Sequence, residues 1–101
     1  MIVYNLTMKI DNAIQEQWLK WQKEEYIPGT MASGLFTQYK FYRLLGQDET
    51  DGITYVLQFF CGDITAYKKY EKEFHHKLQQ KIYLKWGSGC IAFHTVMKDV
   101  P

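Results

Sequence analysis

Three histidines are the side chains of this sequence best suited to proton transfer: His75, His76 and His94. Consecutive helix residues point about 100° apart, so His75 and His76 are not expected to converge on one metal ion. Glu71 precedes His75 by one helical turn, and a carboxylate at that spacing can orient an imidazole. The alternative is a solvated helix face. No HExxH, HxxxH or Cys-His cluster is present, so we expect neither a metal site nor a cofactor.

Amide, imidazole and aromatic side chains on expected strands supply the candidate binding residues. Asn5, Gln58 and His94 can orient a small ligand through hydrogen bonds, and the rings of Tyr42 and Phe60 can line its site. Alternation along the strands predicts that all five side chains share one face of a sheet. The sequence therefore predicts a site for a small, mostly apolar ligand on that face.

Hydrophobic periodicity predicts the elements that carry these residues. Residues 1–10 alternate polar and apolar side chains, which is typical of a strand. A helix follows, with Asp11 or Asn12 as its cap and an apolar stripe of Ile14, Trp18 and Trp21. Pro28 should break or kink this helix. The remaining expected elements are strands over 35–45, 53–61 and 90–98, a glycine-bounded loop over 46–52, and a helix over 64–86 capped by Asp63.

The order β-α-β-β-α-β predicts an α+β fold of the ferredoxin-like type, with a four-stranded antiparallel sheet and two helices on one face. The chain has 101 residues, so we expect one domain spanning 1–101.

The uncovered sheet face is expected to be too apolar for water and too polar for a core. A second copy of the chain covering it would resolve this conflict, so we expect a homodimeric α+β barrel, although a ligand or another protein is an alternative cover. The facing of residues 35–45 stays open, because aromatic side chains occur at both parities. The side chains predicted on this face are Val3, Asn5, Thr7, Phe36, Gln38, Lys40, Tyr42, Thr54, Val56, Gln58, Phe60, Cys90, Ala92, His94 and Val96.

Composition argues against several other classes of protein. Twelve basic and eleven acidic residues give a net charge of +1, so nucleic acid and anionic membranes are not expected as partners. No apolar run reaches the roughly 18 residues of a membrane span, and residues 1–10 do not resemble a signal peptide. Cys61 and Cys90 lack CxxC spacing and predict buried thiols in a cytoplasmic protein, with one disulfide as the alternative.

Several segments resemble a family of small bacterial proteins of unknown function within the dimeric α+β barrel superfamily. They are Trp18-Leu19-Lys20-Trp21, Ile27-Pro28, residues 31–36, Arg43-Leu44-Leu45, Tyr55 to Cys61, and Ala92-Phe93. The family pattern has His in place of Tyr26 and Ala-Pro in place of His75-His76. The resemblance implies the homodimeric barrel and brings no established active site.

Some superfamily members are cofactor-independent or haem-degrading oxygenases that use an Asn on the first strand and a Trp and a His on the second helix. By resemblance, Asn5, Tyr67 and either His75 or His76 are the catalytic candidates, with Tyr67 standing where those enzymes have Trp. A non-catalytic dimerisation module is the third alternative. RNA-recognition modules share this fold, but only Tyr55 is aromatic among the three positions at which they stack bases.

Overall fold

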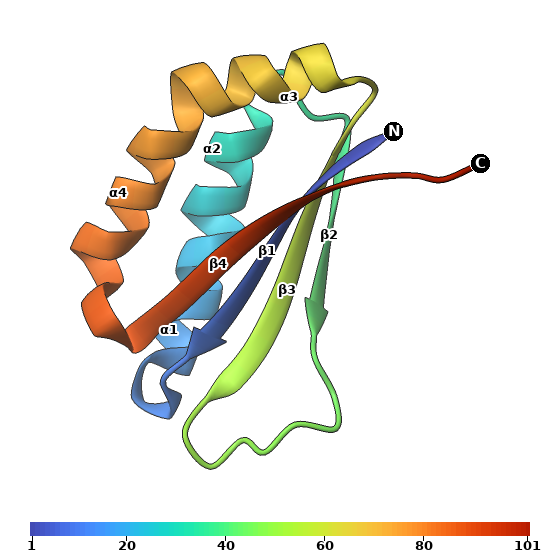
Figure 1. The fold of residues 1–101 in the computed structure, drawn as a ribbon. Helices are drawn as coiled ribbons and strands as arrows, with labels where there is room; N and C mark the ends of the chain where they lie inside the picture. The colour runs from blue at the N-terminus through green and yellow to red at the C-terminus, as the bar shows by residue number, and fades with distance from the viewer.

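The computed structural model describes the whole sequence, residues 1–101. Four strands and two long helical segments follow one another in the predicted order (Figure 1). The strands are β1 (Ile2–Ile10), β2 (Gln38–Arg43), β3 (Ile53–Cys61) and β4 (Cys90–Lys98). The first helical segment comprises a 3-10 turn (Asn12–Ile14), α1 (Gln15–Trp21), a π-helical segment (Gln22–Tyr26) and α2 (Ile27–Met31). The second comprises α3 (Ile64–Tyr70), a π-helical segment (Glu71–His75), α4 (His76–Trp86) and a 3-10 turn (Gly87–Gly89).

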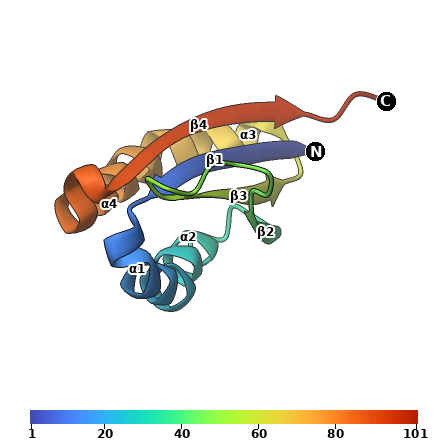
Figure 2. The same ribbon diagram turned by 90° about the horizontal axis from the view of Figure 1, so that it is seen from below.

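The strands form one antiparallel sheet in the order β2-β3-β1-β4. Both helical segments pack on the same face of this sheet, and Figure 2 shows α3 behind the strands in a second view. This arrangement confirms the predicted ferredoxin-like fold.

The hydrophobic core lies between the sheet and the helices. Every second residue of β1 is buried, as the alternation predicted, because β1 is a central strand whose one face meets the helices. Aromatic rings fill much of this core: Trp18 packs on Tyr55 at 4.9 Å between ring centroids, and Phe36 packs on Tyr70 at 4.8 Å. The fully buried β1 side chains are Tyr4, Leu6, Met8 and Ile10.

The first helical segment differs from the prediction at both ends. Asp11 makes no side-chain capping bond, and Gln15 instead donates to the carbonyl oxygen of Ile10 at 2.6 Å. The chain stays helical through Pro28 to Met31. Pro28 lies in the first turn of α2, directly after the π-helical segment, so its missing N–H leaves a gap in the hydrogen bonding of a helix that is already irregular there. The irregularity expected at Pro28 therefore lies one turn earlier.

The second helical segment begins and ends as predicted. The Asp63 carboxylate accepts a hydrogen bond from the Ala66 backbone N–H at 2.9 Å, which satisfies one of the free donors at the helix start. Gly87 ends α4 with a φ of +55°, a conformation that glycine adopts at little cost.

Strand pairing defines which residues lie on the side of the sheet opposite the helices, which we call the open face. Asn5 of β1 lies between Gln58 of β3 and Thr95 of β4, so all three point to this side. The open face consists of Val3, Asn5, Thr7 and Lys9, Gln38, Lys40 and Tyr42, Thr54, Val56, Gln58 and Phe60, and Ile91, Phe93, Thr95 and Met97.

The predicted facing of β4 is wrong. Leu6 pairs with His94 and Tyr4 with Val96, so His94 and Val96 lie on the helix side, together with Cys90 and Ala92. Alternation could not decide this facing, because β4 carries apolar side chains at both parities and a one-residue slip exchanges the two faces. Phe36 was also placed wrongly: it precedes β2 and is buried in the core.

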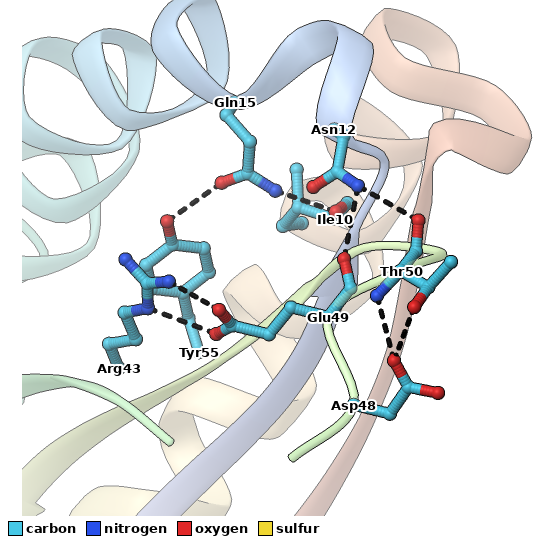
Figure 3. A network of polar contacts seen from close by, with 8 residues as sticks. All are labelled: Ile10, Asn12, Gln15, Arg43, Asp48, Glu49, Thr50 and Tyr55. Carbon is cyan, nitrogen blue, oxygen red and sulfur yellow. Dashed lines mark hydrogen bonds and ion pairs between the residues drawn. The ribbon is translucent and has the colours of Figure 1, made fainter. Parts of the chain in front are cut away.

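The loop between β2 and β3 is fixed to the start of the first helical segment. The Asn12 side-chain amide donates to the carbonyl oxygens of Glu49 and Thr50, both at 3.1 Å. Glu49 also forms a bidentate ion pair with Arg43, at 2.6 and 3.1 Å (Figure 3). The loop is therefore held from both β2 and the 3-10 turn.

Candidate functional site

Two side-chain amides occupy the middle of the open face. Gln58 Nε2 donates to Asn5 Oδ1 at 3.2 Å, and Asn5 Nδ2 donates to the Thr7 hydroxyl at 3.4 Å. Gln58 Oε1 accepts no hydrogen bond within the chain, so it can accept one from a ligand. Lys40 lies beside Gln58 on β2 with its ammonium 5.6 Å from the centre of the Phe60 ring.

Large apolar side chains surround this amide pair. Tyr42 is 49% exposed, Phe93 61% and Ile91 64%, and Met97 is also exposed. A chain of this size seldom leaves so many large apolar residues together in water unless they meet a partner or ligand. Four of the five predicted ligand-binding residues, Asn5, Gln58, Tyr42 and Phe60, share this face.

His94, the fifth predicted ligand-binding residue, lies on the other side of the sheet. Its ring approaches the ring of His75, with 4.6 Å between centroids and an interplanar angle of 64°. The two residues come from β4 and the π-helical segment Glu71–His75. We call them the histidine pair. His94 is exposed and His75 half-buried, so the pair is open to solvent.

The buried Tyr4 lies directly beneath the histidine pair. Its hydroxyl is 3.0 Å from His75 Nδ1, and Gln79 Nε2 donates to the same hydroxyl oxygen at 3.4 Å. Burial raises the pKa of Tyr4 far above its ordinary value, so this group remains a hydroxyl. Burial, and secondly the neighbouring His94, lower the pKa of His75, which favours the neutral imidazole.

The four catalytic candidates are not brought together within this chain. Asn5 lies on the open face, whereas Tyr67 and His75 lie on the helix side around Tyr4, whose ring centroid is 5.8 Å from each of theirs. His76 is exposed. The Tyr67 hydroxyl donates to Glu71 at 3.3 Å, and burial followed by Glu71 raises the pKa of Tyr67 to about 12.

Sequence reasoning missed Tyr4 and Gln79 as members of a site. Tyr4 occupies an inward position of an alternating strand, and such a position predicts only a core residue. Gln79 does carry a signal, since it follows His75 by four residues and so shares its face of a helix. The proximity of His75 to His94 depends on the register of β4, which the sequence did not determine.

No three or more His, Cys, Asp and Glu side chains are arranged to hold a metal ion. None of the helices combines the length and apolar character needed to span a membrane.

The chain matches the domain of unknown function DUF4286 over residues 1–100 and belongs to that family. No curated protein matches the sequence. The family assignment agrees with the resemblance to a family of unknown function.

Solved structures show the same fold at low sequence identity. An antibiotic biosynthesis monooxygenase superimposes with a TM-score of 0.66 and 17% identity, covering 100% of both chains. A dimeric ferredoxin-like protein from an uncultured marine organism gives a TM-score of 0.68 and 8% identity, covering 95% of this chain and 92% of its own. SnoaB, a cofactor-independent oxygenase from Streptomyces nogalater, gives 0.67 and 11%, covering 97% and 92%. These likenesses establish the α+β fold.

Proposed function

We propose that this single-domain chain forms a homodimer through its open face and binds a small, mostly apolar ligand between the two sheets. The observation that carries the proposal is the amide pair Asn5–Gln58 inside a surround of exposed apolar side chains. Such a surface is unfavourable in water but suits an interface with a semi-polar interior.

A second copy of the chain is the cover that the known structures favour. A protein with the same fold is described as dimeric and ferredoxin-like. The side chains named on the open face include two lysines, Lys9 and Lys40, and no acidic residue, so apolar contact must supply most of the association. Lys40 has its ammonium over Phe60 and Lys9 lies at the end of β1, away from the centre of the face.

Substitution of Phe93 by glutamate tests the homodimer. A carboxylate buried in an apolar interface stays unpaired and desolvated, so Phe93→Glu should convert a dimer to a monomer, as measured by light scattering after size-exclusion chromatography. Leu84→Glu is the matched control, since Leu84 is also exposed but lies on α4. A wild-type monomer, or loss of the dimer in the Leu84→Glu variant alone, would refute the proposed interface.

Native mass spectrometry tests the ligand. We expect a dimer carrying a small-molecule adduct, and we expect Asn5→Ala and Gln58→Ala to lose it because each removes a hydrogen-bonding partner of the ligand. Gln80→Ala, an exposed change on α4, should retain the adduct. A dimer of wild-type protein that never carries an adduct would leave the chain as a dimerisation module without a ligand.

A cofactor-independent or haem-degrading monooxygenase is the alternative function, and it has less support. Asn5 is separated from Tyr67 and His75 by the sheet, so the three side chains that the resemblance implied do not face one ligand in this chain. Haem titration tests the haem-degrading enzyme, and oxygen uptake with quinols tests the cofactor-independent one. We expect neither a Soret shift nor oxygen consumption.

A further inference from the structure

The histidine pair carries a chemical arrangement that the open face does not use. Tyr4 is fully buried and its hydroxyl bridges Gln79 Nε2 and His75 Nδ1. The amide nitrogen of Gln79 can only donate, so the Tyr4 oxygen accepts from it. The Tyr4 hydroxyl keeps its own proton to donate, and His75 Nδ1, at 3.0 Å, is a nitrogen that can accept it.

Donation from Tyr4 to Nδ1 would select one tautomer of His75. A neutral imidazole that accepts at Nδ1 carries its proton at Nε2, so His75 offers an N–H donor on the side away from Tyr4. His94 makes no hydrogen bond within the chain and lies beside this ring. With this tautomer, His75 is a hydrogen-bond donor towards solvent, and the neighbouring His94 ring has no hydrogen-bond partner within the chain.

The surroundings indicate which ligand suits these two imidazoles. Glu71 lies one helical turn before His75, and its carboxylate partly offsets the lowering of the His75 pKa, so it would repel an anionic ligand. Val96 lies two residues from His94 on the same side of β4 and is exposed, so it provides apolar surface next to that ring. An uncharged compound with an apolar body and an acceptor oxygen fits best.

We propose that His75 and His94 form an acid–base site for a small, uncharged carbonyl compound that has a C–H bond next to the carbonyl group. A ring nitrogen of His94 takes the proton from this carbon. The C–H electron pair forms the carbon–carbon double bond of an enolate, whose oxygen accepts a hydrogen bond from His75 Nε2–H. Return of the proton from His94 to carbon restores the carbonyl compound, so the exchange needs no other reactant. This site lies across the sheet from the open face and does not depend on the proposed dimer.

Hydrogen–deuterium exchange of a ketone tests this proposal. With 2-indanone in D2O near neutral pH, the wild-type protein should accelerate deuterium incorporation beside the carbonyl beyond free imidazole at equal concentration, followed by proton NMR. Positioned acid–base groups contribute roughly 10²–10⁴-fold to a rate, so His94→Ala and His75→Ala should each lower the exchange rate at least about tenfold. His76→Ala is the matched control and should keep the wild-type rate, because His76 is exposed and belongs to neither imidazole contact.

Tyr4 is a positioning residue in this proposal, and NMR of the histidine nitrogens tests its role. Wild-type His75 should show a proton on Nε2 and none on Nδ1, whereas Tyr4→Phe should give a mixture of tautomers and a lower exchange rate in a folded protein. Circular dichroism confirms that each variant is folded. No acceleration by folded wild-type protein, or equal loss in the His76→Ala variant, would overturn the proposal.

Discussion

At the scale of single residues, the protonation of His75, which contacts the buried Tyr4, should make the stability of the fold depend on pH. Its pKa is lowered first by burial and then by His94, so the folded protein holds its proton less tightly than the unfolded chain does. The unfolded chain therefore binds more protons below the ordinary histidine pKa of about 6.5. The neutral imidazole therefore makes its full contribution to the free energy of unfolding above that pH. This contribution decreases as the pH falls towards the lower pKa that His75 has in the folded protein.

Urea unfolding at several pH values measures this dependence. The free energy of unfolding should decrease from pH 7 to pH 5 in the wild-type protein, and the decrease should be smaller in His75→Gln, which cannot be protonated. His76→Gln should follow the wild-type profile, because His76 is exposed and has no contact with Tyr4. Identical pH profiles for His75→Gln and wild-type protein would contradict this assignment.

Gln22 is a residue whose burial costs stability. It is fully buried in the first π-helical segment, and neither of its side-chain polar atoms has a hydrogen-bond partner. Gln22→Met keeps the length of the side chain and removes both unpaired groups, so it should raise the free energy of unfolding by about 1–3 kcal/mol. The exposed Gln17→Met in α1 should change it little, and a less stable Gln22→Met protein would show that the amide is satisfied by ordered water.

At the scale of elements, Gly52 shows how closely β3 approaches β1. Its φ is +144°, and a Cβ atom there would lie 2.7 Å from the backbone carbonyl oxygen of Ile10. Gly52→Ala should therefore destabilise the fold by about 3 kcal/mol, from both the strained φ and the clash with backbone. Gly46→Ala is the matched comparison: its φ is +76° but nothing lies within 4 Å, so it should cost about 1 kcal/mol. Equal midpoints in thermal unfolding of the two variants would refute the clash.

The accuracy of the sequence reasoning differed between elements for physical reasons. Strand β3 was predicted with its observed bounds because glycines at 52 and 62 flank a run of β-branched and aromatic residues. Strand β2 is shorter than predicted, since the pairing with β3 extends only over Gln38–Arg43. Its facing was left open, and pairing now places Tyr42 on the open face and Phe41 towards the helices.

The site was less predictable than the fold because it depends on contacts between distant segments. Asn5 and Gln58 were correctly assigned to one face, and the structure shows that they bond to each other. His94 was assigned to the wrong face, so its contact with His75 was missed. Neither π-helical segment was expected, since hydrophobic periodicity does not report an extra residue within a turn.

At the scale of the whole molecule, the two cysteines lie at opposite ends of the sheet. Cys61 pairs with Ile2 and Cys90 with Ile10, which are eight residues apart on β1 and thus about 26 Å from each other. A disulfide requires Cα atoms within about 7 Å, so the fold excludes a bond between them within one chain. Both are free and buried, as the sequence predicted for two thiols, and burial raises the pKa of Cys90 to about 11.

These thiols should report global unfolding. Neither cysteine should react readily with a thiol reagent in the native protein, because each is buried and its thiolate is disfavoured. Both should react at the denaturant concentration at which the circular dichroism signal is lost. Rapid labelling of either cysteine under native conditions, identified by mass spectrometry of peptides, would show that its end of the sheet opens independently.

The two hydrogen bonds from Asn12 to the loop before β3 join segments that are far apart in the sequence. Opening the loop breaks the contacts of the 3-10 turn, and unwinding that turn releases the loop. The two segments therefore share one local unfolding equilibrium. Their backbone amide protons should therefore become accessible to solvent in the same opening event, although nearly forty residues separate the two segments along the chain.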